Sequence, residues 1–298
     1  MLETFSAPGS FFRGNLHGHS TNSDGRLDPA EVCARYQHEG YDFIALTDHF
    51  RPNYNFPITD TTAYRTATFT TILGAEVHAP QTSRGEEWHI LAVGLPADFP
   101  ATRADETGPS LARRCAEAGA FVAIAHPHWY QLTLEDARTI DAAHAIEAYN
   151  HTSELHCARG GGEEMWDALL LEGRRLNGIA VDDSHFHDAD AFGGWVMVKA
   201  AHNDPDALLA ALKAGHFYAT QGPTIASVER EGDDLVITSS PAKSVALVGP
   251  VTLSERATGT AITRARLPLT KFAGQWCRAI ITDASGAKAW TNPLWLTA

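Results

Sequence analysis

The sequence feature that most restricts the possible folds of this chain is a recurring unit of a helix, a glycine and a short apolar strand. The helix expected at 28–40 has Asp28 as its N-cap and Pro29 in its first turn, ends at Gly40, and is followed by the apolar run YDFIALT. The same order recurs with helices expected at 110–119, 163–173 and 204–215, before the strands AFVAIA, NGIAV and HFYAT. Helices that alternate with short buried strands are typical of a parallel β/α sheet or barrel.

The pattern changes near Pro223, after which short apolar runs follow one another without a helix-length pattern. The expected strands are DDLVITSS, KSVALVG, AITRARLPL, QWCRAIITD and KAWTNPLWL, separated by Gly, Ser, Asp and Pro. Such a series predicts a small antiparallel β domain of the sandwich type. The 298 residues leave room for a barrel of about 200–250 residues and a smaller unit. We therefore predict one domain at 1–222 and a second at 223–298.

Histidines and acidic residues stand at the ends of the expected strands of the first domain. His17 and His19, in NLHGHS, are two residues apart, so on an extended chain both rings point to one face. Further along stand Asp24, His49 after FIALTD, Glu76 after TILGA, His126 and His128 in FVAIAHPH, and Asp183 and His185 in GIAVDDSH. His89 begins its strand, as expected if that strand runs antiparallel or begins near the same face. Because the C-terminal ends of barrel strands form the active face, we predict that these side chains converge.

Taken singly, each of these residues could also be a solvated polar side chain or a turn residue that binds no metal. Together they form a set of imidazole and carboxylate ligands, which suits a hydrolytic site for Zn, Mn or Fe.

In chain order, HGHS, Asp24, TDH, GAE, His89, AHPH and DDSH resemble the ligand motifs of the polymerase and histidinol phosphatase (PHP) superfamily of metal-dependent hydrolases, over residues 15–222. The resemblance implies an α/β fold, a distorted (β/α)7 barrel, with three divalent metal ions (Zn, Mn or Fe). It implies that the first ion is held by His17, His19, Glu76 and Asp183. Glu76 would bridge to a second ion at His89 and His126, and Asp24, His49 and His185 would hold the third.

The resemblance also implies the activity. A hydroxide that bridges the metals would be the nucleophile, so no side chain is assigned as the catalytic group, and Arg51, His128 and His151 are the candidate substrate-binding residues. The leading hypothesis is a phosphoesterase that cleaves a small phosphorylated molecule. The stretches MWDALLLEGRRLNGIAVDDSH and GGWVMVKA resemble a branch of carbamate and phosphoester hydrolases, which leaves carbamate, ester or amide cleavage as an alternative. A non-catalytic metal-binding module with a partner-binding β domain is a third hypothesis.

Composition narrows the range of partners. With 23 Lys and Arg against 36 Asp and Glu, the net charge of −13 argues against nucleic acid and membrane surfaces as partners. No segment approaches the roughly 20 apolar residues that a membrane span needs. The N-terminus has no basic region before an apolar run, and the four cysteines form no C-x-x-C pair. We therefore expect a cytoplasmic protein that acts on a small molecule, and the sequence leaves its oligomeric state open.

Overall fold

The helix expected at 28–40 begins at its predicted capping residue, whereas the helix expected at 110–119 begins earlier, after Thr107. In the computed structural model, which describes residues 3–297, α2 (Pro29–His38) follows Asp28, whose side chain accepts a hydrogen bond from Glu31 N at 2.8 Å. The other three expected helices are also present, as α3 (Gly108–Glu117), α6 (Glu163–Leu171) and α7 (Pro205–Ala214). Three short helices bring the number of α-helices within residues 3–297 to seven, namely α1 (Glu3–Ser6), α4 (Leu134–Thr139) and α5 (His151–Cys157). Residues 1 and 2 of the first predicted domain and residue 298 of the second lie outside the described residues.

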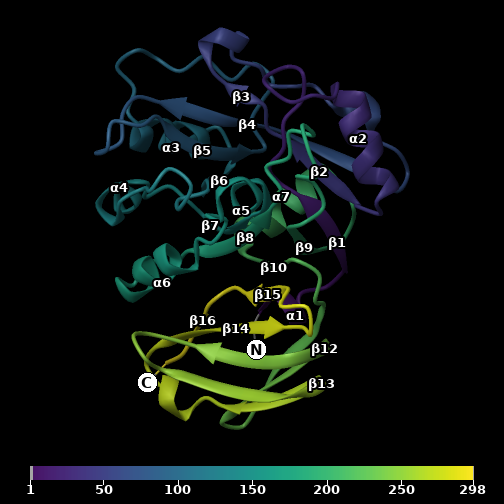
Figure 1. The fold of residues 1–298 in the computed structure, drawn as a ribbon, viewed down its shortest axis with the longest axis vertical. Helices are drawn as coiled ribbons and strands as arrows, with labels where there is room; N and C mark the ends of the chain where they lie inside the picture. Colours follow the sequence, from purple (N-terminus) through teal and green to yellow (C-terminus); the bar gives the residue numbers. More distant parts are fainter. Residues whose placement is uncertain (1–2, 298) are drawn as a thin grey trace.

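Seven strands form a continuous hydrogen-bonded path in the upper part of Figure 1. In order of pairing they are β1 (Ser10–Asn15), β2 (Phe43–Leu46), β4 (Thr70–Ala79), β5 (Trp88–Val93), β6 (Phe121–Ile124), β7 (Ala145–Asn150) and β8 (Asn177–Val181). The pairs are parallel except those of β5 with β4 and β6, so the strand of His89 runs antiparallel, which is one of the two alternatives expected for it. The short β3 (His49–Phe50) adds to β4.

The two ends of this path meet in the segments that follow β1 and β8. Asp183 N donates to His17 O at 3.0 Å, and His19 N donates to Ser184 O at 2.8 Å. Buried apolar side chains such as Leu16, Phe121 and Val181 pack together within the same group of strands. The segments that carry the predicted ligands are therefore tied to one another by backbone hydrogen bonds.

Two further strands extend the sheet in an antiparallel manner. β9 (Trp195–Ala200) pairs antiparallel with β1, and β10 (Phe217–Thr220) pairs antiparallel with β9. The expected strand HFYAT is thus present as β10, but it lies outside the seven-strand path. It also pairs antiparallel with its neighbour β9, whereas parallel pairing was expected. α7 joins β9 to β10 and packs against β9, and the register pairs Phe217 with Val198 and Thr220 with Trp195, so the two strands run in opposite directions.

The C-terminal strands pair only in antiparallel fashion, as expected. They are β11 (Ile225–Glu231), β12 (Asp234–Val248), β13 (Ser254–Pro268), β14 (Trp276–Thr282), β15 (Lys288–Thr291) and β16 (Leu294–Trp295). Two expected strands are in fact the single strand β12, whose register with β13 shifts between Thr238 and Ala242. This irregularity accommodates Pro241, because proline in a sheet is confined to edges and bulges. β11 was not expected from the sequence.

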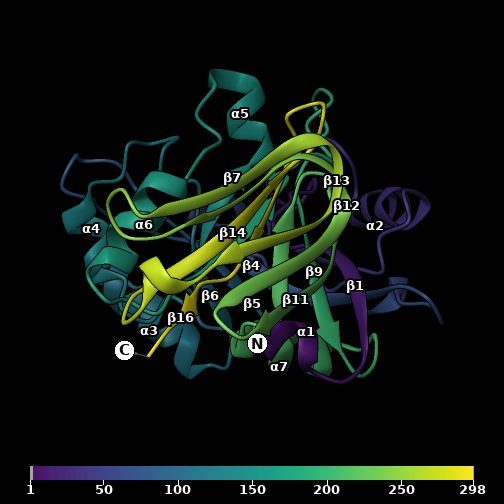
Figure 2. The ribbon, with the colours of Figure 1, turned by 90° about the horizontal axis from the view of Figure 1, so that it is seen from below.

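The C-terminal strands lie at one end of the molecule (Figure 1), and Figure 2 shows β12, β13 and β14 in front when that end faces the viewer. β15 pairs with β10, so the hydrogen-bonded sheet continues from one part into the other. Arg278 of β14 also binds Asp167 of α6 through bonds of 2.9 and 3.0 Å. The predicted boundary between residues 222 and 223 falls in the turn before β11, and the independence of the two parts stays a prediction.

No α-helix within residues 3–297 combines the length and apolar character required for a membrane crossing.

Candidate metal centre

His17 and His19 lie side by side just beyond the end of β1. The segment that carries them is extended rather than part of the strand, and its pairing with Ser184 holds both rings toward the same space, with centroids 5.2 Å apart. Both side chains are buried. The convergence expected from their spacing is therefore present, although a segment after the strand provides it.

Glu76 occupies the middle of the cluster. It is fully buried on β4, and its Oε1 lies 2.6 Å from His89 Nδ1 and 3.0 Å from His126 Nε2. Its Oε2 lies 2.6 Å from His49 Nδ1 and 3.6 Å from His17 Nε2. One carboxylate thus faces imidazoles from β3, β5 and the segments after β1 and β6, which is the position required of a residue that bridges two cations.

Asp183 and His185 reach the cluster from the segment after β8. Asp183 adopts a left-handed backbone conformation with φ of 60°, and its Oδ1 lies 2.9 Å from His19 Nε2 and 3.3 Å from His17 Nε2. Left-handed backbone in a residue other than glycine is strained and concentrates at functional sites. On the outer side of the cluster, Asp24 lies 3.3 Å from His49 Nε2 and 3.5 Å from His185 Nε2. All nine predicted ligands are therefore gathered in one place.

Several buried atoms in this cluster have no hydrogen-bond partner. They are His17 Nε2, His19 Nδ1 and His126 Nδ1. Buried polar atoms in folded proteins are almost always paired, so three unpaired ones in a single cluster call for a ligand. Sets of donor atoms within 4.8 Å of one another include Glu76 with His89 and His126, His17 with His19 and Glu76, and His19 with Asp24, His49 and His185. Nitrogen and carboxylate oxygen are the donors that Zn, Mn and Fe accept, so the residues fit the divalent ions that the sequence resemblance implies.

Burial and opposite charge compete in setting the pKa values of these groups. Burial would raise the pKa of Glu76, but the imidazoles of His49 and His89 outweigh it and hold that pKa well below its usual range. Burial would lower the pKa of His49, but Glu76 and Asp24 raise it to about 10. Burial, together with two neighbouring imidazoles, lowers the pKa of His19 to about 4. The carboxylates thus strongly favour nearby positive charge, which bound divalent cations also supply.

His78 is a member of the cluster that the sequence analysis missed. Its Nδ1 lies 3.1 Å from the carbonyl oxygen of Trp88, which can only accept, and its Nε2 lies 2.9 Å from His49 Nδ1. Arg51 Nη2 is 3.3 Å from the same Nδ1 but is directed to Glu87 Oε2 at 2.9 Å. His78 therefore donates to the carbonyl and accepts from His49 Nδ1, which leaves His49 Nε2 free to face Asp24. The i, i+2 spacing of Glu76 and His78 on one strand was the available signal.

Glu147 is a second residue that was missed. It is fully buried on β7, with its Oε1 2.7 Å from His17 Nδ1, and its Oε2 accepts from His126 N at 2.7 Å and from Asn150 Nδ2 at 2.9 Å. The carboxylate keeps the proton of His17 on Nδ1 and leaves Nε2 free toward Asp183 and Glu76. Carboxylates behind ligating histidines commonly fix the tautomer in this way. Its signal was a lone acidic residue within the apolar strand AIEAYN.

A cavity of about 290 Å³ opens onto the cluster. Beside the ligands, its walls include Arg51, Trp129, Thr152, Ser153, His156 and His187. Trp129 is 42% exposed, and its ring lies edge-on to those of His126 and His89, with centroids 5.1 and 5.4 Å away. The cavity thus offers one guanidinium and one exposed aromatic face beside the cluster.

The three candidate substrate residues have different positions. Arg51 lines the cluster cavity, whereas His128 lines a neighbouring cavity. His151 lines neither of these two, and its Nδ1 lies 2.9 Å from the Tyr149 hydroxyl. A substrate contact for each of the three remains a prediction.

Comparison with known proteins shows a related fold. Neither a protein-family model nor a curated protein matches the sequence. Among solved structures, a two-domain protein containing a predicted PHP-like metal-dependent phosphoesterase from Bacteroides vulgatus ATCC 8482 matches with a TM-score of 0.55 and 17% identity, over 96% of each chain. At this identity the match establishes a common fold, and the PHP resemblance seen in the sequence is confirmed at that level.

Two weaker matches cover 58% of this chain and 87% of the other. One is a candidate metal-dependent phosphoesterase from Bifidobacterium adolescentis ATCC 15703, with 17% identity and a TM-score of 0.41. The other is an amidohydrolase from Chromobacterium violaceum with bound sulfate and no metal, with 16% identity and a TM-score of 0.44. Both scores are too low to support an inference about this chain.

Proposed function

We propose that this protein is a metal-dependent phosphoesterase that cleaves a small phosphorylated molecule. The observation that carries the proposal is Glu76, a fully buried carboxylate with ring nitrogens of three histidines within 3.0 Å and a fourth at 3.6 Å. Such a concentration of ionisable groups is costly to bury unless cations are bound among them. The unpaired atoms of His17, His19 and His126 in the same cluster support the same reading.

The proposal assigns three divalent ions, of Zn, Mn or Fe, to the nine clustered residues. His17, His19, Glu76 and Asp183 would hold one, Glu76, His89 and His126 a second, and Asp24, His49 and His185 a third. Divalent cations in such a site supply Lewis acidity toward a phosphoryl oxygen and make water more acidic.

The chain's own residues would position the substrate beside that cluster. Arg51 lines the cavity, and its Nη2 is held by the half-exposed Glu87 at 2.9 Å. A guanidinium binds phosphate oxygens through several N–H groups at once, so a substrate phosphate would compete with Glu87 for Arg51. Trp129 would pack against the group that leaves and exclude water from that side. Glu147 and His78 would keep the protons of His17 and His49 on the nitrogens that face away from Asp183 and Asp24.

We also propose an architecture and a cellular location for the enzyme. We propose that the seven-strand path, closed by the bonds between the segments after β1 and β8, is the distorted (β/α)7 barrel, with residues 223–298 as a small β domain. A cytoplasmic location is supported by the four free cysteines, of which Cys33, Cys115 and Cys277 are buried.

Turnover of matched substrates tests the function. Protein loaded with Zn or Mn is assayed on an aryl phosphate and on an aryl carbamate with the same leaving group, and again after chelation. We expect metal-dependent release from the phosphate in excess of that from the carbamate. Faster cleavage of the carbamate would replace this proposal with the carbamate, ester or amide hydrolase, and metal binding without turnover of either would favour the non-catalytic module.

A further inference from the structure

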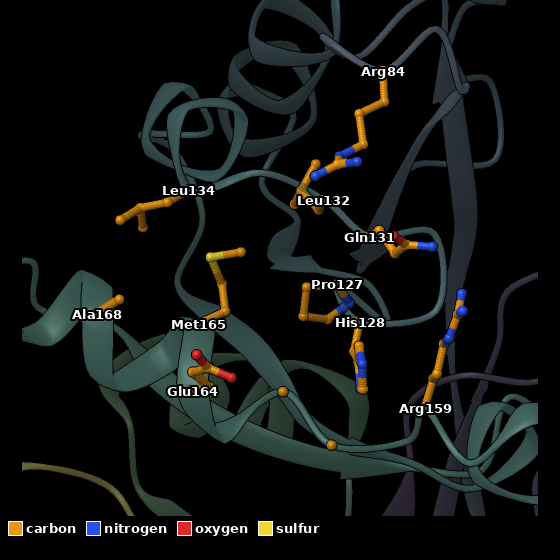
Figure 3. A pocket seen from close by; sticks show the side chains of 12 residues that line it. Arg84, Pro127, His128, Gln131, Leu132, Leu134, Arg159, Glu164, Met165 and Ala168 are labelled. Atoms are coloured by element: carbon orange, nitrogen blue, oxygen red, sulfur yellow. The ribbon is translucent and has the colours of Figure 1, made fainter.

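A second cavity of about 500 Å³, drawn in Figure 3, takes lining residues from two of the segments that also line the metal-cluster cavity. The two share the turn at 126–132, which supplies His126 and Trp129 to the cluster cavity and His128 and Gln131 to the second. They also share the segment at 152–162, which supplies Ser153 to the first and Arg159 to the second. Neighbouring residues of these two segments thus line both cavities, which places the cavities side by side.

The floor of the second cavity is apolar and two of its edges are cationic. Pro127, Leu132, Leu134, Met165 and Ala168 provide the apolar surface. Figure 3 shows Arg84 and Arg159 entering from two different segments of the chain.

Neither guanidinium is neutralised by a carboxylate. Within residues 3–297, Arg84 takes part in no side-chain hydrogen bond or ion pair, and Arg159 donates only to the carbonyl oxygen of Trp129, at 3.3 Å. Glu164 is the acidic residue among those that line the cavity, so the two arginines leave a net positive charge there. Unpaired guanidinium groups in a chain with a net charge of −13 favour an anionic ligand at this place.

We propose that the second cavity binds the leaving-group end of the substrate and selects leaving groups that join an apolar body to a second anionic group. This inference rests on the proposed hydrolase function. The apolar body would lie on Leu132 and Met165, and the distal anion would bind Arg84 and Arg159. The combined cavities, of about 290 and 500 Å³, match the size of pockets for whole small molecules rather than for a bare phosphate ion.

Two alkyl phosphates of equal length, one with a terminal carboxylate and one with a terminal hydroxyl, test this selection. We expect kcat/KM for the carboxylate to exceed that for the hydroxyl compound by about tenfold, since a charged hydrogen bond contributes about that much. The double substitution Arg84→Gln with Arg159→Gln should remove the preference, mainly by raising KM for the carboxylate compound. Arg230→Gln, at an exposed arginine on β11, is the matched control and should keep the preference. High salt should weaken it, because the arginines are accessible to solvent.

Equal kcat/KM for the two wild-type substrates, or a preference that survives the double substitution, would overturn the inference. The corresponding pair of carbamates is assayed in parallel. If the carbamates are cleaved and the phosphates are not, the proposed reaction is wrong, and the preference for the carboxylate is still measured on the carbamates. If the protein proves inactive, calorimetry can still measure the binding of an ω-carboxyalkyl phosphonate and of its hydroxyl counterpart, because binding needs no turnover. There, tighter binding of the carboxylate that depends on the two arginines supports the inference, and equal binding refutes it.

Discussion

Substitution of Glu147 by glutamine should weaken metal binding without removing any proposed ligand. The carboxylate accepts from three donors, His17 Nδ1, His126 N and Asn150 Nδ2, at 2.7 to 2.9 Å. The side-chain amide of glutamine has one oxygen and one NH2 group, so one of the three present donor sites must face the NH2 group. The backbone N–H of His126 cannot change, and Asn150 is held through its Oδ1 by Ser153 N at 2.9 Å.

In the Glu147→Gln variant, the amide oxygen must therefore take the side of His126 and Asn150. The amide NH2 group then meets His17 Nδ1, which has to accept, and the ring proton moves to Nε2. That atom faces Asp183 at 3.3 Å and Glu76 at 3.6 Å, and with a proton it no longer offers a lone pair. Loss of such a supporting carboxylate typically lowers metal affinity about 10- to 100-fold. The lost charged hydrogen bonds should also lower the free energy of unfolding by about 1.5–3 kcal/mol.

Competition against a chromophoric chelator, with Zn or Mn, measures the affinities of the wild type and the variant. Glu106→Gln is the matched control, because Glu106 is also buried and bound by Arg114 at 2.7 and 2.8 Å, outside the cluster. The control should lose a similar amount of stability and keep its metal affinity. Wild-type affinity at every site in a folded Glu147→Gln protein would refute the reasoning, as would an equal loss in the control.

Three other changes test the cluster. Glu76→Gln should abolish most activity and release at least one ion, measured by turnover and metal analysis; a near-normal rate with full metal content would exclude Glu76 as the bridge. His78→Gln, which keeps an acceptor near Nε2, should retain metal affinity, whereas His78→Leu should lose about tenfold at one site; equal affinities would remove His78 from the role of orienting His49. In chelated protein, His49, with its pKa raised to about 10 against 6.5 unfolded, contributes stability that is lost as pH rises from 6.5 toward 10. His19, with its pKa lowered to about 4, causes a loss as pH falls from 6.5 toward 4. Urea unfolding should therefore show greatest stability near pH 6.5, and a steady rise from pH 5 to 9 would contradict these assignments.

The clustering of the nine predicted ligands was accessible from the sequence because most of them stand at strand ends. Strand direction decides where such an end lies, and the position of His89 at the start of its strand was compatible with the antiparallel direction that β5 has. The capped helices were predictable for a local reason as well, since Asp28 and its acceptor bond to Glu31 N lie within one turn.

Long-range contacts explain what the sequence did not reveal. Glu147 contacts His17 across 130 positions, and nothing local to either residue indicates the pairing. His78 appeared to be an ordinary strand residue because its role depends on the backbone of Trp88 on the neighbouring strand. In β12, Pro241 suggested a break, but a bulge in the pairing with β13 carries the strand through it.

Metal content per chain is the most direct test of the central claim that the cluster around Glu76 binds divalent cations for hydrolysis. Protein purified without chelator, or reloaded with Zn or Mn and then desalted, is analysed for bound metal, beside a variant in which Ala replaces both His17 and Asp183. The account predicts about three equivalents in the wild type and a clear loss in the variant, because the variant lacks two proposed ligands of one ion. One equivalent or fewer in the folded, reloaded wild type, or the same content in both proteins, would contradict it.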